Sequence, residues 1–480
     1  MTARGPTSLA LMPLLTLNDF ERDALDTLTA YATIPCLSPM YDAQWSEHGY
    51  LDQAVELLAS WARQRRLANA EVSVQRLDGR TPLLMITVEE SGPTRGTTVL
   101  YGHLDKQPPL GDWSEGLDPF TPVRRGDRLY ARGVADDGYA VFGALLALEA
   151  MEANGVSHGR CVVLIEASEE SGSPDLEAHL DALADHLGDV QLMICLDSGA
   201  LSYDRLWVTT SLRGVVNVEL TVRVLSRGVH SGSASGVAPS SFRVLRQLIE
   251  RIEDSGTGEI LLDELRPVIP DAAREAARAT AEEFGDVVVD ELPFLTGVDP
   301  MGASAQERIL RRSWYPTLSV VGMSGIPEPE RAGNVLRPYT EALLSIRLAP
   351  NTDPAVACDA LARVLSTEVP SNAQVEYAFH PGGGWVAPPL APWLEAALEA
   401  ASLDAFGRAP GFTGEGGSIP FLNSLAQRYR DVQFVATGVL GPDSNAHGID
   451  EMLDLTMAVG VINAVTEVVG AFAKHVMEDA

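Results

Sequence analysis

The feature that most constrains the fold is an alternation of short apolar runs with helix-periodic segments in the first two hundred residues. Strand-like runs occur at 97–101, 160–167 and 190–196, and helical periodicity occurs at about 139–154 and 176–187. Buried strands that alternate with helices are typical of a parallel sheet covered on both faces. The alternation therefore predicts an α/β fold, with a mostly parallel sheet and helices on both faces.

The pattern changes from about residue 211. Residues 215–225 (VVNVELTVRVL) alternate apolar and polar side chains, as a strand with one solvent-exposed face does, and a loop rich in glycine and serine follows. The first pattern resumes beyond residue 380, where two helices flank a strand at 432–437. The predicted boundaries are 1–210 and 381–480 for the two parts of a catalytic domain, and 211–380 for an inserted α+β domain.

Charge and cysteine usage limit the possible partners and the compartment. Of 480 residues, 35 are Lys or Arg and 66 are Asp or Glu, and the net charge of −31 argues against binding to nucleic acid or to an anionic membrane surface. The four cysteines show no paired spacing, which indicates reduced thiols and a cytoplasmic protein. The sequence contains no run of 18 uninterrupted apolar residues, so we predict no membrane-spanning helix.

Histidines and carboxylates follow several of the predicted strands. Any one of them is more often structural, but the ligand site of an open α/β sheet lies outside the carboxyl ends of its strands, where such residues can converge. Two histidines with several carboxylates and no thiolate suit zinc, manganese or cobalt. The residues are His103, Asp105, Glu169, Glu170, Asp197 and His447, with Asp136 and Asp137 at a predicted helix start.

Several motifs, taken in order, resemble those of a known family. GHLD, DPF, GVADDG, EESGS and PDSNAHGIDE are similar to motifs of the dinuclear metallopeptidases. That family includes carnosine dipeptidases, glutamate carboxypeptidases, aminoacylases and succinyl-diaminopimelate desuccinylases. RGVHSG, YPTLSVVG, LLSIRLAP and GEGGSIP resemble its cytosolic dipeptidase branch. The resemblance extends from about Leu25 to the last predicted helix.

The resemblance implies a site for two divalent ions in each subunit. His103 and Asp197 would hold one ion, Glu170 and His447 would hold the other, and Asp136 would bridge both. Zinc is the ion that the resemblance favours, with manganese or cobalt as alternatives. The resemblance also implies a cis peptide bond after Asp136.

Further roles follow from the same resemblance. Glu169 would be the general base, and Asp105 would orient His103. His230 would reach the active site of a neighbouring subunit, which implies a homodimer formed through the inserted lid domain. The residues that would contact substrate are Arg347, Asn334, Ser418 and Glu415.

The sequence departs from the family in three places. ADDGY replaces the commoner Asp-Asp-Lys-Gly, and NVLRP has one residue more than the pattern Thr-Val-Ile-Pro. The second departure weakens the match with the family at Asn334 more than at Arg347. Residues 283–301 match no part of the family that we recognise.

The predicted activity is hydrolysis of the amide bond of small peptides, with Arg347 gripping the substrate carboxylate. An N-acyl amino acid deacylase or a carboxypeptidase with the same site is an alternative, because those substrates also carry a free carboxylate. A catalytically silent binding protein is a further alternative from another class.

Overall fold

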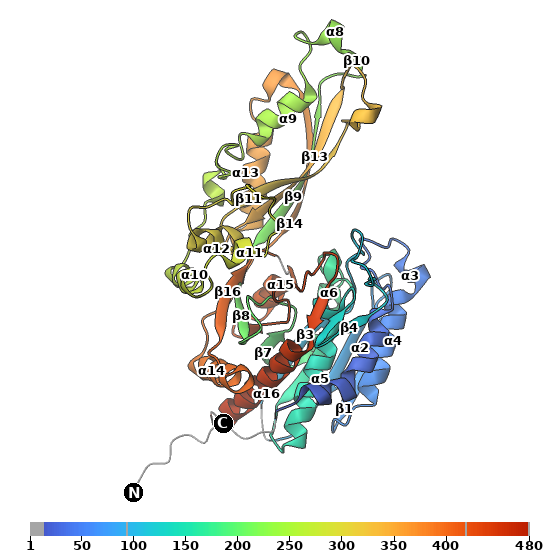
Figure 1. Cartoon of the computed structure of the whole chain (residues 1–480), viewed down its shortest axis with the longest axis vertical. Coiled ribbons are helices and arrows are strands. Elements are labelled where there is room, and N and C mark those ends of the chain that lie inside the picture. The colour runs from blue at the N-terminus through green and yellow to red at the C-terminus, as the bar shows by residue number, and fades with distance from the viewer. Residues whose placement is uncertain (1–13, 93–94, 418–419, 479–480) are drawn as a thin grey trace. The chain divides into compact units, whose positions relative to one another are not determined.

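The computed structural model describes residues 14–92, 95–417 and 420–478 (Figure 1). The chain forms two compact units. Unit 1 contains the described residues up to Thr210, then Ala387–Thr413 and the chain from Ser424 onward. Unit 2 contains Ser211–Val386 and Gly414–Asn423.

The large sheet of unit 1 is parallel at its centre. Its central strands lie in the order β6, β3, β7, β17, and each neighbouring pair is parallel. These strands are β6 (Arg160–Glu166), β3 (Thr97–His103), β7 (Val190–Cys195) and β17 (Gln433–Ala436). The carboxyl ends of all four strands therefore lie at one edge of the sheet.

The outer strands of this sheet are antiparallel. β2 pairs with β6 and with β1, and β8 pairs with β17 and with β15. Their bounds are β1 (Ala70–Gln75), β2 (Leu83–Val88), β8 (Trp207–Leu212) and β15 (Trp385–Val386), and β16 (Gly411–Glu415) also pairs with β8. The division between the units assigns β15 and the last two residues of β8 and of β16 to unit 2. The predicted α/β class is confirmed, but the sheet is mixed. The loop between β1 and β2 is too short for the crossover that parallel pairing needs.

Apolar strands and helices form the interior of unit 1. Every residue of β2 and β3 is buried. Helix α5 (Ala140–Ala153) packs on β3 and β6 and also against α16 (Leu455–Glu478). Among the described residues, α16 is the one helix long and apolar enough to span a membrane, but 83% of its most apolar stretch is buried inside the protein. It is a core helix of unit 1.

Other elements of unit 1 support the sheet and the loops at its edge. A three-stranded sheet of order β18-β5-β4 joins two distant parts of the chain. Its strands are β4 (Val123–Arg125), β5 (Arg128–Tyr130) and β18 (Met452–Asp454). The further helices are α1 (Leu17–Phe20), η1 (Glu21–Leu25), α2 (Asp26–Ala32), α3 (Trp45–His48), α4 (Tyr50–Arg63), α6 (Leu176–Ala182), α7 (Ala184–Leu187) and α14 (Pro392–Phe406). The division between the units falls within α15 (Pro420–Arg428), after Asn423.

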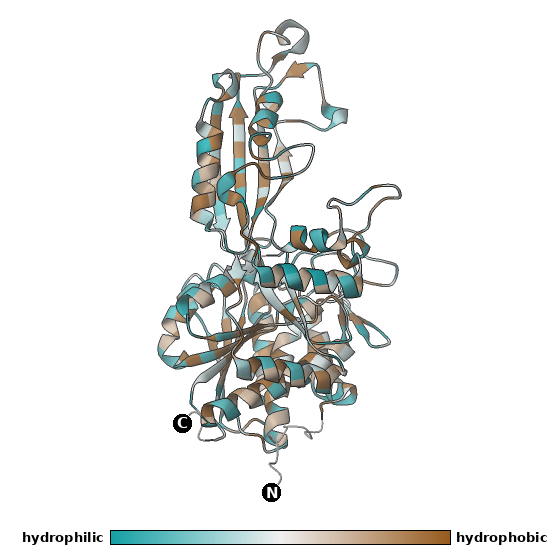
Figure 2. Ribbon diagram, turned by 90° about the vertical axis from the view of Figure 1, so that its left-hand side faces the viewer, coloured by the Kyte–Doolittle hydropathy of each residue, from teal (hydrophilic) through white to brown (hydrophobic). Residues whose placement is uncertain are grey.

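Unit 2 is built on a four-stranded antiparallel sheet of order β11-β13-β9-β14. Its strands are β9 (Gly214–Arg223), β11 (Thr317–Ser324), β13 (Tyr339–Leu348) and β14 (Gln374–Gly382). Alternate residues of β9 and β13 are buried, as the sequence predicts for β9, and the strands are banded in Figure 2. Helices α9 (Ser241–Ile249) and α13 (Pro354–Ser366) share a core with the buried face.

The rest of unit 2 consists of a small helical core and a two-stranded ribbon. Helices α10 (Asp271–Phe284) and α12 (Ala305–Ser313) pack together around Trp314, and α11 (Val287–Asp290) adds Val288 to this core. β10 (Val229–His230) pairs with β12 (Val335–Leu336), and α8 (Ser231–Ala234) follows β10. Val287 and Val288 of this core belong to the segment 283–301.

Candidate metal centre

Four predicted ligands follow the four central strands of unit 1. His103 ends β3, Glu170 lies in the turn η3 (Glu169–Ser171) after β6, Asp197 follows β7, and His447 lies in the loop after β17. Because these strands are adjacent and parallel, their ends present all four side chains at one edge of the sheet. The structure thus brings together residues that are far apart in the sequence.

Asp136 lies between the two histidines. It belongs to the turn η2 (Val134–Gly138), and the peptide bond between Asp136 and Asp137 is cis, as predicted. Asp136 Oδ1 is 3.1 Å from His103 Nε2, and Asp136 Oδ2 is 3.0 Å from His447 Nε2. The two oxygens of one carboxylate therefore face two different imidazoles, which is the arrangement that a bridging ligand requires.

The remaining carboxylates divide between the two histidines. Glu170 Oε2 is 3.3 Å from His447 Nε2, and Asp197 Oδ2 is 3.8 Å from His103 Nε2. Two groups have ligand atoms within 4.8 Å of one another: His103, Asp136 and Glu170, and His103, Glu169 and Asp197. Donor atoms are thus gathered on both sides of Asp136.

The proximity of these groups changes their pKa values. Burial and the Asp197 charge raise the pKa of Glu169, and burial and the Asp136 charge raise the pKa of Glu170. Burial favours neutral Asp136, but hydrogen bonds with the two histidines hold its pKa below the ordinary value. Asp136 and Glu170 raise the pKa of His447, whose side chain is 55% exposed, to about 11. The raised pKa values of the two glutamates and of His447 are those expected where several carboxylates lie close together, whereas the lowered pKa of Asp136 comes from its two histidine partners.

The donor set fits divalent metal ions. Within the described part of the chain, the buried atoms Glu170 Oε1 and Asp137 Oδ1 have no hydrogen-bond partner. A buried carboxylate oxygen without a donor is costly, and a cation compensates for it directly. Imidazole nitrogens and carboxylate oxygens are the ligands that zinc and manganese take in proteins.

The hydrogen bonds of Asp105 differ in part from the prediction that this residue orients His103. His103 Nδ1 is 3.0 Å from the backbone carbonyl of Asp105 but 3.5 Å from its carboxylate. The carboxylate instead accepts the backbone N–H groups of Glu169, at 3.1 Å, and Glu170, at 3.0 Å. Asp105 therefore contacts His103 through its backbone carbonyl and fixes the Glu169–Glu170 turn through its side chain.

The sequence prediction did not include Gln107. Its Nε2 donates to Glu170 Oε2 at 2.6 Å, and the residue is buried. Partners of this kind orient ligand side chains and fix the oxygen that faces the ion. Its position in the stretch GHLDKQPP, four residues after His103, was the available signal.

The other predicted residues belong to unit 2. His230 lies on β10 opposite Val335, and the N–H of Ser231 donates to the carbonyl of Asn334 at 2.9 Å. His230 and Asn334 are therefore neighbours, and both are exposed. Arg347 lies on β13 and Glu415 ends β16, whereas Ser418 lies outside the described residues.

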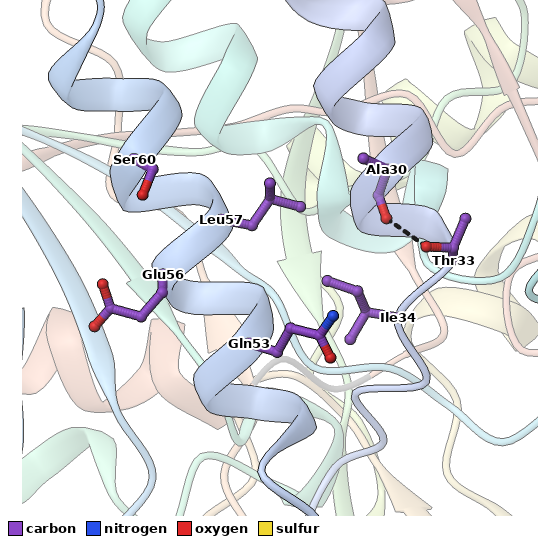
Figure 3. Close-up of a pocket in the computed structure, with 7 residues that line it drawn as sticks. All are labelled: Ala30, Thr33, Ile34, Gln53, Glu56, Leu57 and Ser60. Atoms are coloured by element: carbon purple, nitrogen blue, oxygen red, sulfur yellow. Dashed lines mark hydrogen bonds between the residues drawn. The ribbon is translucent and has the colours of Figure 1, made fainter.

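A groove between helices α2 and α4 is separate from these residues (Figure 3). Its lining contains one carboxylate, Glu56, which forms an ion pair with Arg76. Thr33 Oγ1 at its rim donates to the carbonyl of Ala30 at 2.7 Å. The lining contains no histidine and no cysteine, so the groove does not offer a metal-ligand set.

Comparison with known proteins identifies the family. The family model described as peptidase family M20/M25/M40 matches residues 99–475, which include all the candidate metal ligands. The chain belongs to this family. The prediction of a metal-dependent peptidase is confirmed at this level, and membership implies divalent metal ions as cofactors.

Two relatives and a solved structure show how far the similarity to the family extends. The Cys-Gly metallodipeptidase DUG1 of Saccharomyces cerevisiae is 29% identical over 392 residues, which cover 79% of this chain and 80% of the yeast protein. The Beta-Ala-His dipeptidase of Homo sapiens is 26% identical over 413 residues, 81% of this chain and 78% of the human protein. The crystal structure of human carnosine dipeptidase 1 has a TM-score of 0.76 at 21% identity, and the match covers 95% of this chain and 97% of the human chain.

Proposed function

We propose that this protein is a dipeptidase or short-peptide exopeptidase that uses two divalent ions, with zinc as the first choice and manganese or cobalt as alternatives. The observation that carries the proposal is the position of Asp136, whose two oxygens face His103 and His447. Asp197 would complete the position at His103, and Glu170 would complete the position at His447. The two relatives named above are a Cys-Gly dipeptidase and a Beta-Ala-His dipeptidase.

Glu169 is the proposed general base. When bound, the two ions supply Lewis acidity, which lowers the pKa of a water molecule and polarises the amide carbonyl. Glu169 lies in the group that contains His103 and Asp197, yet it is not needed to complete either ligand pair. Its carboxylate would take the proton from the attacking water and return it to the leaving amine. The hydrogen bond from its backbone N–H to Asp105 supports this role, because it fixes the turn that carries Glu169.

Arg347 is the proposed contact for the substrate carboxylate. It is half-buried on β13, and burial lowers the pKa of its guanidinium. A planar guanidinium can hold a carboxylate through two parallel hydrogen bonds. This contact would restrict the enzyme to short peptides with a free C-terminus. We also propose that Asn334, Glu415 and Ser418 contact the substrate.

The length of the unit 2 sheet supports a homodimer in which His230 acts on the neighbouring subunit. Arg347 lies eight residues along β13 from Tyr339, a span of about 26 Å for an extended strand. His230 lies beyond the Tyr339 end, because β10 follows the far end of β9 and pairs with β12. A dipeptide is too short to contact Arg347 and His230 of the same subunit. If both contact one substrate, they come from different subunits.

Strand β11 supports the same proposal. It is an edge strand of the unit 2 sheet, and its side chains Val320, Val321 and Met323 are exposed. An exposed apolar edge strand is a ready template for pairing with another chain, so proteins usually cover it. If the unit 2 sheets of two subunits paired through β11 about a two-fold axis, the edge strand of each subunit would be covered by the other.

The experiment that tests the proposed activity is a hydrolysis screen of dipeptides, tripeptides and N-acyl amino acids with added zinc or manganese. We expect the highest kcat/KM for dipeptides with a free carboxylate. Preference for N-acyl amino acids would identify a deacylase, and release of single C-terminal residues from longer peptides would identify a carboxypeptidase. If none of these substrates is hydrolysed, the remaining alternative is a catalytically silent binding protein. We also propose a cytoplasmic location, supported by four cysteines that are free thiols.

A further inference from the structure

A buried ion pair beside the metal centre is not used by the proposed mechanism. The Glu451 side chain is 0% exposed and the Arg132 side chain is 1% exposed, and Arg132 Nη1 donates to Glu451 Oε2 at 2.8 Å. Both lie in unit 1, and neither belongs to the candidate ligands. Glu451 ends the GIDE sequence after His447, and Arg132 precedes the turn that carries Asp136.

Glu451 holds the backbone of the turn that carries Asp136. Its Oε2 also accepts the N–H of Gly133 at 2.9 Å, and its Oε1 accepts the N–H groups of Ala135, at 3.1 Å, and Asp136, at 3.2 Å. With Arg132, each carboxylate oxygen has two donors, which fills the acceptor capacity of the group. Glu451 is therefore saturated with hydrogen bonds and is not itself a metal ligand.

Arg132 connects this turn with the loop that carries His447. Its Nη2 donates to the carbonyl of Gly448, the residue directly after His447. The backbone contributes as well, because the N–H of Ala131 donates to the carbonyl of Glu451 at 3.1 Å. One guanidinium thus contacts both Glu451 and the His447 loop, and a planar guanidinium can do this with fixed geometry.

We propose that Glu451 and Arg132 are positioning residues that set the separation of Asp136 and His447 and thereby the affinity of the ion shared by these two ligands. This inference rests on the proposed dinuclear site. The physical reason is that two loops more than 300 residues apart in sequence must keep their donor atoms at metal-binding distance. Hydrogen bonds to the backbone on both sides of the site fix that distance before an ion binds.

The test uses metal-free protein and a competing chromophoric chelator to measure the number and affinity of zinc ions. For Glu451→Gln, we expect the dissociation constant of one of the two ions to rise about 10- to 100-fold, as for other residues that support metal ligands. The dissociation constant of the other ion should change much less. Arg132→Lys keeps the charge but cannot span both partners, and it should show the same selective loss to a smaller degree.

Glu149→Gln is the matched control. Glu149 forms a mostly buried ion pair with Arg65 and accepts the N–H of Arg66, but it lies on α5, away from the ligand loops. We expect both this variant and Glu451→Gln to lose thermal stability, because each breaks a buried ion pair, but Glu149→Gln should keep both zinc affinities within about threefold of wild type.

Two outcomes would overturn the inference. It is overturned if Glu451→Gln binds both ions as tightly as wild type, or if the control loses affinity equally. If Glu451→Gln does not fold, Arg132→Lys decides by the same criterion. Wild-type protein that binds fewer than two ions would instead contradict the proposed function itself.

Discussion

Glu169 and Glu170 are adjacent in the sequence, but their carboxylates serve different parts of the site. Glu170 Oε2 lies 3.3 Å from His447 and also accepts a hydrogen bond from Gln107, whereas Glu169 groups with His103 and Asp197. Asp105 accepts the backbone N–H groups of both residues and so fixes the turn. One short turn would therefore supply a ligand and a base under the proposed mechanism, and substitution can separate the two roles.

We predict that Glu169→Gln binds two metal ions but loses about 10²- to 10⁴-fold in kcat, because the base is not a ligand. Glu170→Gln is the matched control, since it changes the neighbouring residue in the same way and should reduce the number of bound ions. Metal analysis and steady-state kinetics on both variants test this. Activity of Glu169→Gln within a few-fold of wild type would show that another group is the base.

Metal binding should release protons near neutral pH. Asp136 and Glu170 raise the pKa of His447 to about 11, so at pH 7 the imidazole is protonated and a metal ion must displace that proton. Because the proton competes with the ion, affinity falls as pH falls, by about tenfold per pH unit for each proton released. Calorimetry at pH 7 in buffers of different ionisation enthalpy measures the number released. His447→Asn should release one proton fewer, and an unchanged number would contradict the assignment.

At the scale of elements, the site follows from four parallel strands with polar residues at their ends. β3, β6 and β7 were predictable because each is an apolar run followed directly by His103, by Glu169 and Glu170, or by Asp197. β17 was predictable for the same reason, as an apolar run upstream of His447. Parallel neighbours then place these ends together, whatever the sequence between them.

Elements held by distant contacts could not be predicted in this way. β4, β5 and β18 have three residues each, too few for a periodic pattern, and β18 finds its partner β5 more than 300 residues away. β8 crosses the point at which the sequence pattern changes, and the sequence analysis predicts no strand over its residues. Arg132 and Glu451 are single charged residues that become recognisable only through their contact across the fold.

The edge strand β11 gives a prediction at this scale. Val321 is 59% exposed, and Val321→Lys should prevent pairing of two sheets, because it places charge on an edge strand that the proposed dimer covers. We expect a monomer by light scattering. Val356→Lys, at a 45% exposed position on α13, is the control and should leave the assembly unchanged. A Val321→Lys variant with the same mass as wild type in solution would contradict a dimer formed through β11.

At the scale of the whole molecule, the two units have different proposed tasks. Unit 1 carries the candidate ligands and the base, and unit 2 carries Arg347 and His230. The span of β13 separates Arg347 from the His230 end of the sheet, so a complete site needs residues from two chains if both contact one substrate. Activity should then depend on assembly.

Mixing two inactive variants tests this dependence. Glu169→Gln and His230→Ala should each be nearly inactive alone, but in a mixed dimer one site receives both defects and the other receives neither. With random and complete exchange, activity should return to about a quarter of wild type, because half of the dimers are mixed and each has one intact site of two. A mixture as inactive as its parents, despite proven exchange, would place His230 in its own subunit's site or outside catalysis.

The central claim is that Asp136 joins two metal positions into one peptidase site, and a titration of metal-free protein tests it most directly. Zinc or manganese is added in known equivalents while dipeptide hydrolysis is followed, with Asp136→Asn as the comparison. The account predicts that activity rises to a plateau at two ions per subunit and that the variant shows no such rise. Peptide hydrolysis that persists in the presence of a chelator, or a variant that reaches the wild-type plateau, would contradict it.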